Sequence, residues 1–129
     1  MTEEELNFDV LIVGAGPAGL SAAIKLKMLA LDENRPISIC IIEKSSSLGG
    51  HIISGAIFDP KALSELFPKW KTSKCPIKTP VNDDIFYFFP NKDKSVKLPS
   101  FLIPNSLKNN GCYVTSLSEL VKWLGEKAE

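Results

Sequence analysis

Two short apolar runs frame a helical segment near the start of the chain. Residues 8–13 read FDVLIV and lead into Gly14, and an apolar run bounded by glycine is typical of a buried parallel strand. Residues 17–31 place apolar side chains at helical spacing, and residues 32–36 interrupt that pattern. A second apolar run, residues 37–42, reads ISICII. The order strand, helix, strand predicts an α/β fold that opens with a parallel sheet.

Regular elements become shorter after this opening unit. Residues 45–50 are rich in serine and glycine and predict a loop, whereas residues 60–67 predict a short helix. Residues 85–89, IFYFF, are the best strand candidate in a stretch whose prolines favour loops and short edge strands. Residues 116–119 read S-x-x-E ahead of an apolar stripe, which predicts a capping box and a C-terminal helix. The prolines of the middle stretch are Pro68, Pro76, Pro80, Pro90, Pro99 and Pro104.

A glycine motif follows the first predicted strand and opens the first predicted helix. It reads G-x-G-x-x-G, and in this motif Gly14 permits a tight turn, Gly16 lets the backbone approach a pyrophosphate, and Gly19 lets the helix pack on the strand. The phosphates bind at the helix N-terminus, because free N–H groups and the helix dipole favour an anion there. With Pro17 and Ala18 between them, these residues predict a dinucleotide-binding turn.

Glu43 supplies the acidic residue that such a motif requires at the end of the second strand. Its carboxylate is placed to accept hydrogen bonds from a ribose 2′-OH and would repel the 2′-phosphate of NADP. NAD and FAD are both compatible with this arrangement. The alternative is an ordinary βαβ unit with a chance glycine turn and a solvated glutamate. We favour the dinucleotide site because strand, glycines, helix and acid occur in the order that the motif requires.

Small and polar residues after Glu43 offer further places for a cofactor. Gly49 and Gly50 present a backbone without side chains that a cofactor could approach, although a flexible turn explains them equally well. His51 is the single histidine of the chain, and it is either near a flavin or structural. Ser54 and Gly55 offer a second such backbone or, alternatively, a tight bend.

Composition and charge exclude several other classes of protein. Lys+Arg and Asp+Glu both number 15, and this neutral balance argues against a nucleic-acid-binding protein. Cys40, Cys75 and Cys112 fit neither a disulfide framework nor a metal-binding motif, so we expect a reducing compartment and no metal site. No apolar stretch reaches the roughly 18 residues of a membrane span, and residues 1–5 lack a signal or transit pattern. No acid–base pair stands out, so we assign no catalytic residue.

From Phe8 onward the chain resembles the electron transfer flavoprotein–ubiquinone oxidoreductase family. The most particular part of the resemblance is residues 54–71, SGAIFDPKALSELFPKWK, and Gly50 departs from it because the family more often has alanine there. The resemblance is carried by residues 9–27 (DVLIVGAGPAGLSAAIKLK), residues 41–71 (IIEKSSSLGGHIISGAIFDPKALSELFPKWK), residues 76–81, residues 109–113 and residues 117–129 (LSELVKWLGEKAE).

This resemblance implies FAD as the cofactor, held in a two-part fold, and a [4Fe–4S] cluster in the same protein. Electrons would come from electron transfer flavoprotein and pass to ubiquinone at a membrane surface. By position, the residues implied for the ADP half of FAD are Gly14, Gly16, Ala18, Gly19, Glu43 and Lys44. Those implied to lie nearer the pyrophosphate and isoalloxazine are Gly50, His51, Ser54 and Gly55.

We therefore expect residues 1–129 to be a partial, Rossmann-like FAD-binding domain, the N-terminal part of a longer chain. Residues 8–44 would form the ADP-binding βαβ unit and residues 45–129 the remainder, with short strands and a C-terminal helix. The cluster cysteines, the quinone-facing surface and the second set of FAD contacts would lie beyond Glu129, so this chain alone should not transfer electrons. The resemblance implies a peripheral location on the bacterial cytoplasmic membrane or the mitochondrial inner membrane, through regions outside the chain.

Three alternatives remain open from the sequence. A Fix-type electron-transfer flavoprotein subunit or a geranylgeranyl-reductase-like flavoenzyme would share the glycine motif. A non-catalytic truncated product would keep the fold without binding nucleotide well. Residues 85–89 and 98–104 could also contact a membrane or a quinone, although apolar runs of this length are more often core strands or loop anchors.

Overall fold

The computed structural model describes residues 5–129, so the predicted lack of a signal pattern in residues 1–5 falls outside it except at Glu5. None of the helices in this described part combines the length and apolar character needed to cross a membrane. The elements in chain order are β1 (Val10–Val13), α1 (Pro17–Asp32), β2 (Ile39–Ile42), β3 (Ala56–Phe58), α2 (Lys61–Leu66), the 3-10 turn η1 (Trp70–Thr72), β4 (Thr79–Pro80), β5 (Tyr87–Asn91), β6 (Lys94–Lys97), the 3-10 turns η2 (Ser100–Leu102) and η3 (Asn105–Leu107), β7 (Tyr113–Thr115) and α3 (Leu117–Ala128).

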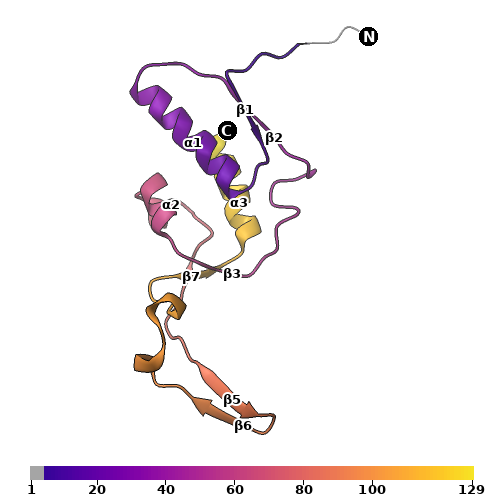
Figure 1. Ribbon diagram of the computed structural model, residues 1–129. Helices are drawn as coiled ribbons and strands as arrows, with labels where there is room; N and C mark the ends of the chain where they lie inside the picture. Colours follow the sequence, from indigo (N-terminus) through magenta and orange to yellow (C-terminus); the bar gives the residue numbers. More distant parts are fainter. Residues whose placement is uncertain (1–4) are drawn as a thin grey trace.

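The first three elements form the predicted βαβ unit (Figure 1). Strands β1 and β2 pair in parallel, from Val10 opposite Ile39 to Val13 opposite Ile42. Both strands begin two residues later than the apolar runs predict. The reason lies at Asp9 and Ser38, where side-chain hydrogen bonds take the place of the backbone hydrogen bonds of a parallel sheet. The Asp9 carboxylate accepts hydrogen bonds from the Ser38 N–H and hydroxyl, each at 2.7 Å.

Helix α3 packs on α1 and closes the main hydrophobic core (Figure 1). Its buried face includes Leu120, which is 2% exposed, and Val121, which is 0% exposed. The predicted helix start is confirmed, because Ser116 is the N-cap and its hydroxyl accepts a hydrogen bond from the Glu119 N–H at 3.4 Å. In a full capping box the Glu119 side chain would also accept a hydrogen bond from the Ser116 N–H. Here the Glu119 carboxylate instead pairs with the Lys122 ammonium at 2.7 Å.

Between β2 and α3 the chain builds a small antiparallel sheet in the order β3-β7-β4. The short helix predicted over residues 60–67 is confirmed as α2. Its neighbour Trp70 is buried, and the indole N–H of Trp70 donates to the Ser64 hydroxyl at 2.9 Å. An edge-to-face contact between Phe67 and Trp123, with ring centroids 5.3 Å apart, joins this region to α3.

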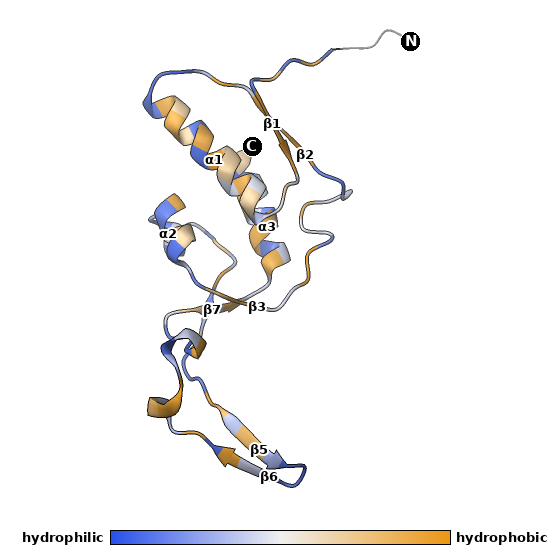
Figure 2. Cartoon of the chain, in the orientation of Figure 1, coloured by the Kyte–Doolittle hydropathy of each residue, from blue (hydrophilic) through white to orange (hydrophobic). Residues whose placement is uncertain are grey.

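The hairpin of β5 and β6 projects away from the rest of the molecule (Figure 1). The strand predicted over residues 85–89 exists but is shifted to Tyr87–Asn91, where it pairs with Lys94–Lys97. Every residue of both strands is exposed. Figure 2 shows apolar segments in this hairpin and in the neighbouring η2 turn, with hydrophilic residues at the hairpin tip.

One face of the parallel sheet is also open. Val10 and Ile12 alternate with Leu11 and Val13, and the latter two are 59% and 78% exposed. Ile42, opposite Val13 on β2, is 47% exposed. Strands of a parallel sheet are normally buried on both faces, so this unit carries an apolar face that the described residues do not cover.

Candidate cofactor site

The glycine turn between β1 and α1 takes the geometry that a dinucleotide site needs. Gly14 adopts φ +103°, a region that favours glycine, and its N–H donates to the Ile42 carbonyl at 2.7 Å. Gly16 is the N-cap of α1 and Pro17 is its first residue, and no side chain caps this helix end. A Cβ built on Gly16 would meet no heavy atom within 4 Å, so the backbone there faces open space.

Gly19 has a different reason to be glycine. A Cβ at this position would collide with the carbonyl oxygen of Gly14 and would lie 3.2 Å from Cγ2 of Ile12. Helix α1 therefore approaches β1 too closely for any side chain at Gly19. This close approach holds the first turn of α1 directly above the end of the strand.

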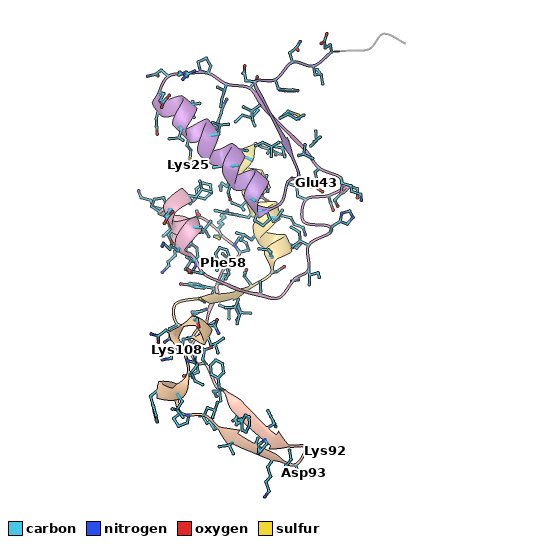
Figure 3. The ribbon with its side chains drawn as sticks, in the orientation of Figure 1. Lys25, Glu43, Phe58, Lys92, Asp93 and Lys108 are labelled. Atoms are coloured by element: carbon cyan, nitrogen blue, oxygen red, sulfur yellow. The ribbon has the colours of Figure 1, made fainter. Side chains whose placement is uncertain are left out.

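Glu43 fixes the glycine turn from the end of β2 (Figure 3). One carboxylate oxygen accepts a hydrogen bond from the Ala15 N–H at 2.7 Å, and the other accepts one from the Ser45 N–H at 2.8 Å. The hydrogen bonds from Ser45 and Ala15 lower the pKa of the Glu43 carboxyl below its usual value, and the charge of His51 adds to this effect. The carboxylate is exposed and ionised at neutral pH, and it keeps lone pairs for further donors such as ribose hydroxyls.

The β2–β3 loop, residues 43–55, holds the remaining predicted contacts, and these divide into two groups. Gly49 is buried against α3, where the Ser118 hydroxyl donates to its carbonyl at 3.0 Å, and Ser54 donates to the Ser116 hydroxyl at 2.8 Å. The second group consists of Lys44, Gly50, His51 and Gly55, which are exposed, as Ser54 is. The structure thus brings the glycine turn and Glu43 together, while it turns Gly49 and Ser54 toward α3.

Gly50 is exposed but lies close to two serines of its own loop. A Cβ there would lie 2.5 Å from the Ser45 hydroxyl oxygen and 3.1 Å from that of Ser47. Both are ends of side chains that can rotate, so an alanine at this position would require only small shifts of the two serines. Sequence reasoning missed Ser118 and Gly125 of α3, because no local pattern links them to the loop.

Within residues 5–129 no group of three or more His, Cys, Asp or Glu side chains could hold a metal ion. The thiols of Cys40, Cys75 and Cys112 are free, and burial raises the pKa of the Cys75 thiol. A cavity of about 750 Å³ lies at the base of the β5–β6 hairpin, lined by Asp84 and Lys97 among others. None of its lining residues is a predicted cofactor contact.

Comparisons with known proteins agree with this geometry. Residues 12–69 match the family model of the NAD(P)-binding Rossmann-like domain, which confirms the predicted fold class. Over 98% of its length the chain is 50% identical to a probable electron transfer flavoprotein-ubiquinone oxidoreductase of Acinetobacter baylyi. It is also 48% identical over its whole length to the electron transfer flavoprotein-ubiquinone oxidoreductase of Pseudomonas aeruginosa, and 52% identical over 98% of its length to the mitochondrial one of Arabidopsis thaliana.

The chain is a relative of the electron transfer flavoprotein-ubiquinone oxidoreductases. The predicted resemblance to this family is confirmed by identities of 47–52%. The chain spans about a fifth of the length of these oxidoreductases, namely 22%, 23% and 19% of the three described above.

The hydrogen bonds to Glu43 predict a dependence of stability on pH. A carboxyl whose folded-state pKa is lowered contributes stability above its unfolded pKa, and this contribution is lost as the pH falls through the folded pKa. We expect the thermal midpoint of the protein to fall over roughly pH 5 to 3, and Glu43→Gln to flatten that decline. Thermal melts across this range test it, with Glu126→Gln at an exposed position of α3 as the matched control. Equal slopes for the wild type and Glu43→Gln would contradict the assignment.

Proposed function

We propose that this chain is the ADP-binding part of an FAD-dependent oxidoreductase that passes electrons from electron transfer flavoprotein to ubiquinone. Residues 8–44 hold the ADP half of FAD, and residues 45–129 are the remainder of a partial FAD-binding domain. The observation that carries the proposal is the glycine turn. Its backbone faces open space, no side chain caps the start of α1, and the ionised Glu43 carboxylate holds the turn through the Ala15 N–H. The names of its relatives support the two electron-transfer partners.

In this proposal FAD supplies the redox chemistry, and the chain binds and orients it. The pyrophosphate lies at the first turn of α1, where N–H groups without a side-chain cap favour an anion. Glu43 accepts hydrogen bonds from the ribose, and its charge disfavours a 2′-phosphate. We assign Gly50, His51, Ser54 and Gly55, all of which are exposed, to the region nearer the pyrophosphate and isoalloxazine. Electron transfer would need the rest of the longer protein.

Two substitutions test the ADP half of the proposal. Gly16→Val fills the open space that we assign to the pyrophosphate, and Glu43→Ala removes the acceptor for the ribose. In the complete protein that carries this chain, we expect both variants to lower FAD content sharply. For Glu43→Ala the loss of hydrogen bonds to a charged group corresponds to at least about tenfold in affinity, and for Gly16→Val the side chain blocks the pyrophosphate sterically. The measurement is flavin absorbance per chain after purification. Flavin content equal to wild type in both variants would refute the site.

The proposed [4Fe–4S] cluster belongs to parts of the protein outside this chain. Within this chain, Cys40, Cys75 and Cys112 are too widely scattered in the sequence to match a cluster motif. We expect low-temperature EPR of the dithionite-reduced complete protein to show a [4Fe–4S] signal beside about one FAD per chain. Flavin without a cluster would instead favour a Fix-type subunit or a geranylgeranyl-reductase-like enzyme.

Peripheral contact with a membrane is the last part of the proposal. Ubiquinone is a membrane-dissolved acceptor, and the β5–β6 hairpin exposes Tyr87, Phe88 and Phe89 at 52%, 58% and 67%. Lysines flank these rings, including Lys92 at the hairpin tip (Figure 3). Aromatic rings with nearby cations suit the interface of an anionic bilayer, so this chain would contribute to a contact otherwise made by other regions.

Replacing Phe88 and Phe89 by serine tests the membrane contact. We expect the double variant of the complete protein to sediment with vesicles containing anionic lipid several-fold less than wild type, because two exposed apolar rings are lost. Ser95→Ala, on the neighbouring exposed strand, is the control. If the double variant binds vesicles like wild type, the hairpin is not a membrane contact.

A further inference from the structure

We propose that helix α3 positions the β2–β3 loop for the flavin half of FAD, and that Ser118 and Gly125 are positioning residues for the cofactor. This inference rests on the proposed function and adds to it two residues that lie outside the glycine motif. Neither residue is placed to touch FAD. Each acts through a loop residue that it holds in place.

Ser118 holds the loop through the backbone of Gly49. Its hydroxyl donates to the Gly49 carbonyl at 3.0 Å, across 69 positions of sequence, in a partly buried setting. The two residues are packed so closely that a Cβ at Gly49 would lie 2.8 Å from both the carbonyl and the hydroxyl oxygen of Ser118. Gly49 also adopts φ +75°, so its position in the loop is set by turn geometry and by α3 together.

Gly125 holds the loop through the side chain of Leu48. A Cβ on Gly125 would collide with Cδ1 of Leu48, so the leucine fills the space that a side chain on α3 would otherwise occupy. Gly125 is buried, and Leu48 packs against the main hydrophobic core. Glycine is a poor helix former, and the space that Gly125 leaves for Leu48 is a physical reason for a glycine at this position of α3.

These contacts connect the loop to the phosphate-binding helix. Helix α3 packs along α1, and the hydroxyl of Ser54 adds a third contact by donating to Ser116, the N-cap of α3, at 2.8 Å. Helix α1 begins at the glycine turn. The distance between the start of α1 and the exposed residues Gly50 and His51 is therefore set through α3, in addition to the direct chain connection at Glu43.

The arrangement predicts different effects on the two halves of the cofactor. Glu43 and the glycine turn bind the ADP half, whereas the loop beyond Leu48 lies toward the flavin half. Ser118→Ala and Gly125→Ala should therefore weaken the binding of FAD and leave the binding of ADP unchanged. Glu43→Ala should weaken both. A residue that only stabilises the fold would change the affinities for both ligands together, or neither.

The experiment is calorimetric titration of FAD and of ADP into the apo form of the complete protein, with visible circular dichroism of the bound flavin. We expect Ser118→Ala to weaken FAD roughly threefold to tenfold, the range of one lost hydrogen bond, and to alter the flavin dichroism. Gly125→Ala should do the same by displacing Leu48. The matched control is Ser95→Ala, at an exposed position of β6 on the projecting hairpin.

An unchanged ratio of FAD to ADP affinity in Ser118→Ala, with wild-type dichroism, would overturn the inference even if the thermal midpoint falls. Should Gly125→Ala fail to fold, Ser118→Ala decides alone, because it removes only a hydroxyl. Wild-type protein that binds no FAD would overturn the proposed function and this inference together. If the wild type binds FAD and the Ser118→Ala and Gly125→Ala variants bind it with the same affinity, the inference alone is overturned.

Discussion

The packing of α3 on α1 is the interaction on which the rest of this structure depends. It buries Leu20 and Ile24 of α1 with Leu120 and Leu124 of α3 in one cluster. Each such side chain contributes roughly 1.5–3 kcal/mol when it leaves water, whereas a two-stranded sheet alone has little stability. The βαβ unit of β1, α1 and β2 is thus stabilised by α3, which lies about 75 residues further along the chain than β2.

Much of the βαβ unit could be predicted from the sequence because its signals are local. An apolar run, a glycine turn and a helical repeat follow one another without interruption, and Pro17 begins α1 as expected. The glycine turn and Glu43 meet because the carboxyl ends of neighbouring parallel strands share one edge. The pairing of Gly14 with Ile42 follows from that same register.

The three-stranded sheet and the loop contacts could not be predicted because their partners are far apart. Strands β3 and β7 have three residues each, too few to show alternation, and they exist only by pairing across the chain. The contact of Gly49 with Ser118 has no local signature either. The expected strand near Phe89 was displaced because the hairpin register, not hydrophobicity, decides where β5 pairs.

Gly16 at the N-cap of α1 and Gly19 in its first turn differ in a way that matters for interpreting natural variation. Any amino-acid substitution at Gly19 adds a Cβ that meets the Gly14 carbonyl, so even alanine disturbs the backbone. At Gly16 the same methyl group enters open space. A variant at Gly19 would therefore reduce the amount of folded protein in a cell, whereas one at Gly16 would leave normal amounts of folded protein with the proposed phosphate-binding turn obstructed.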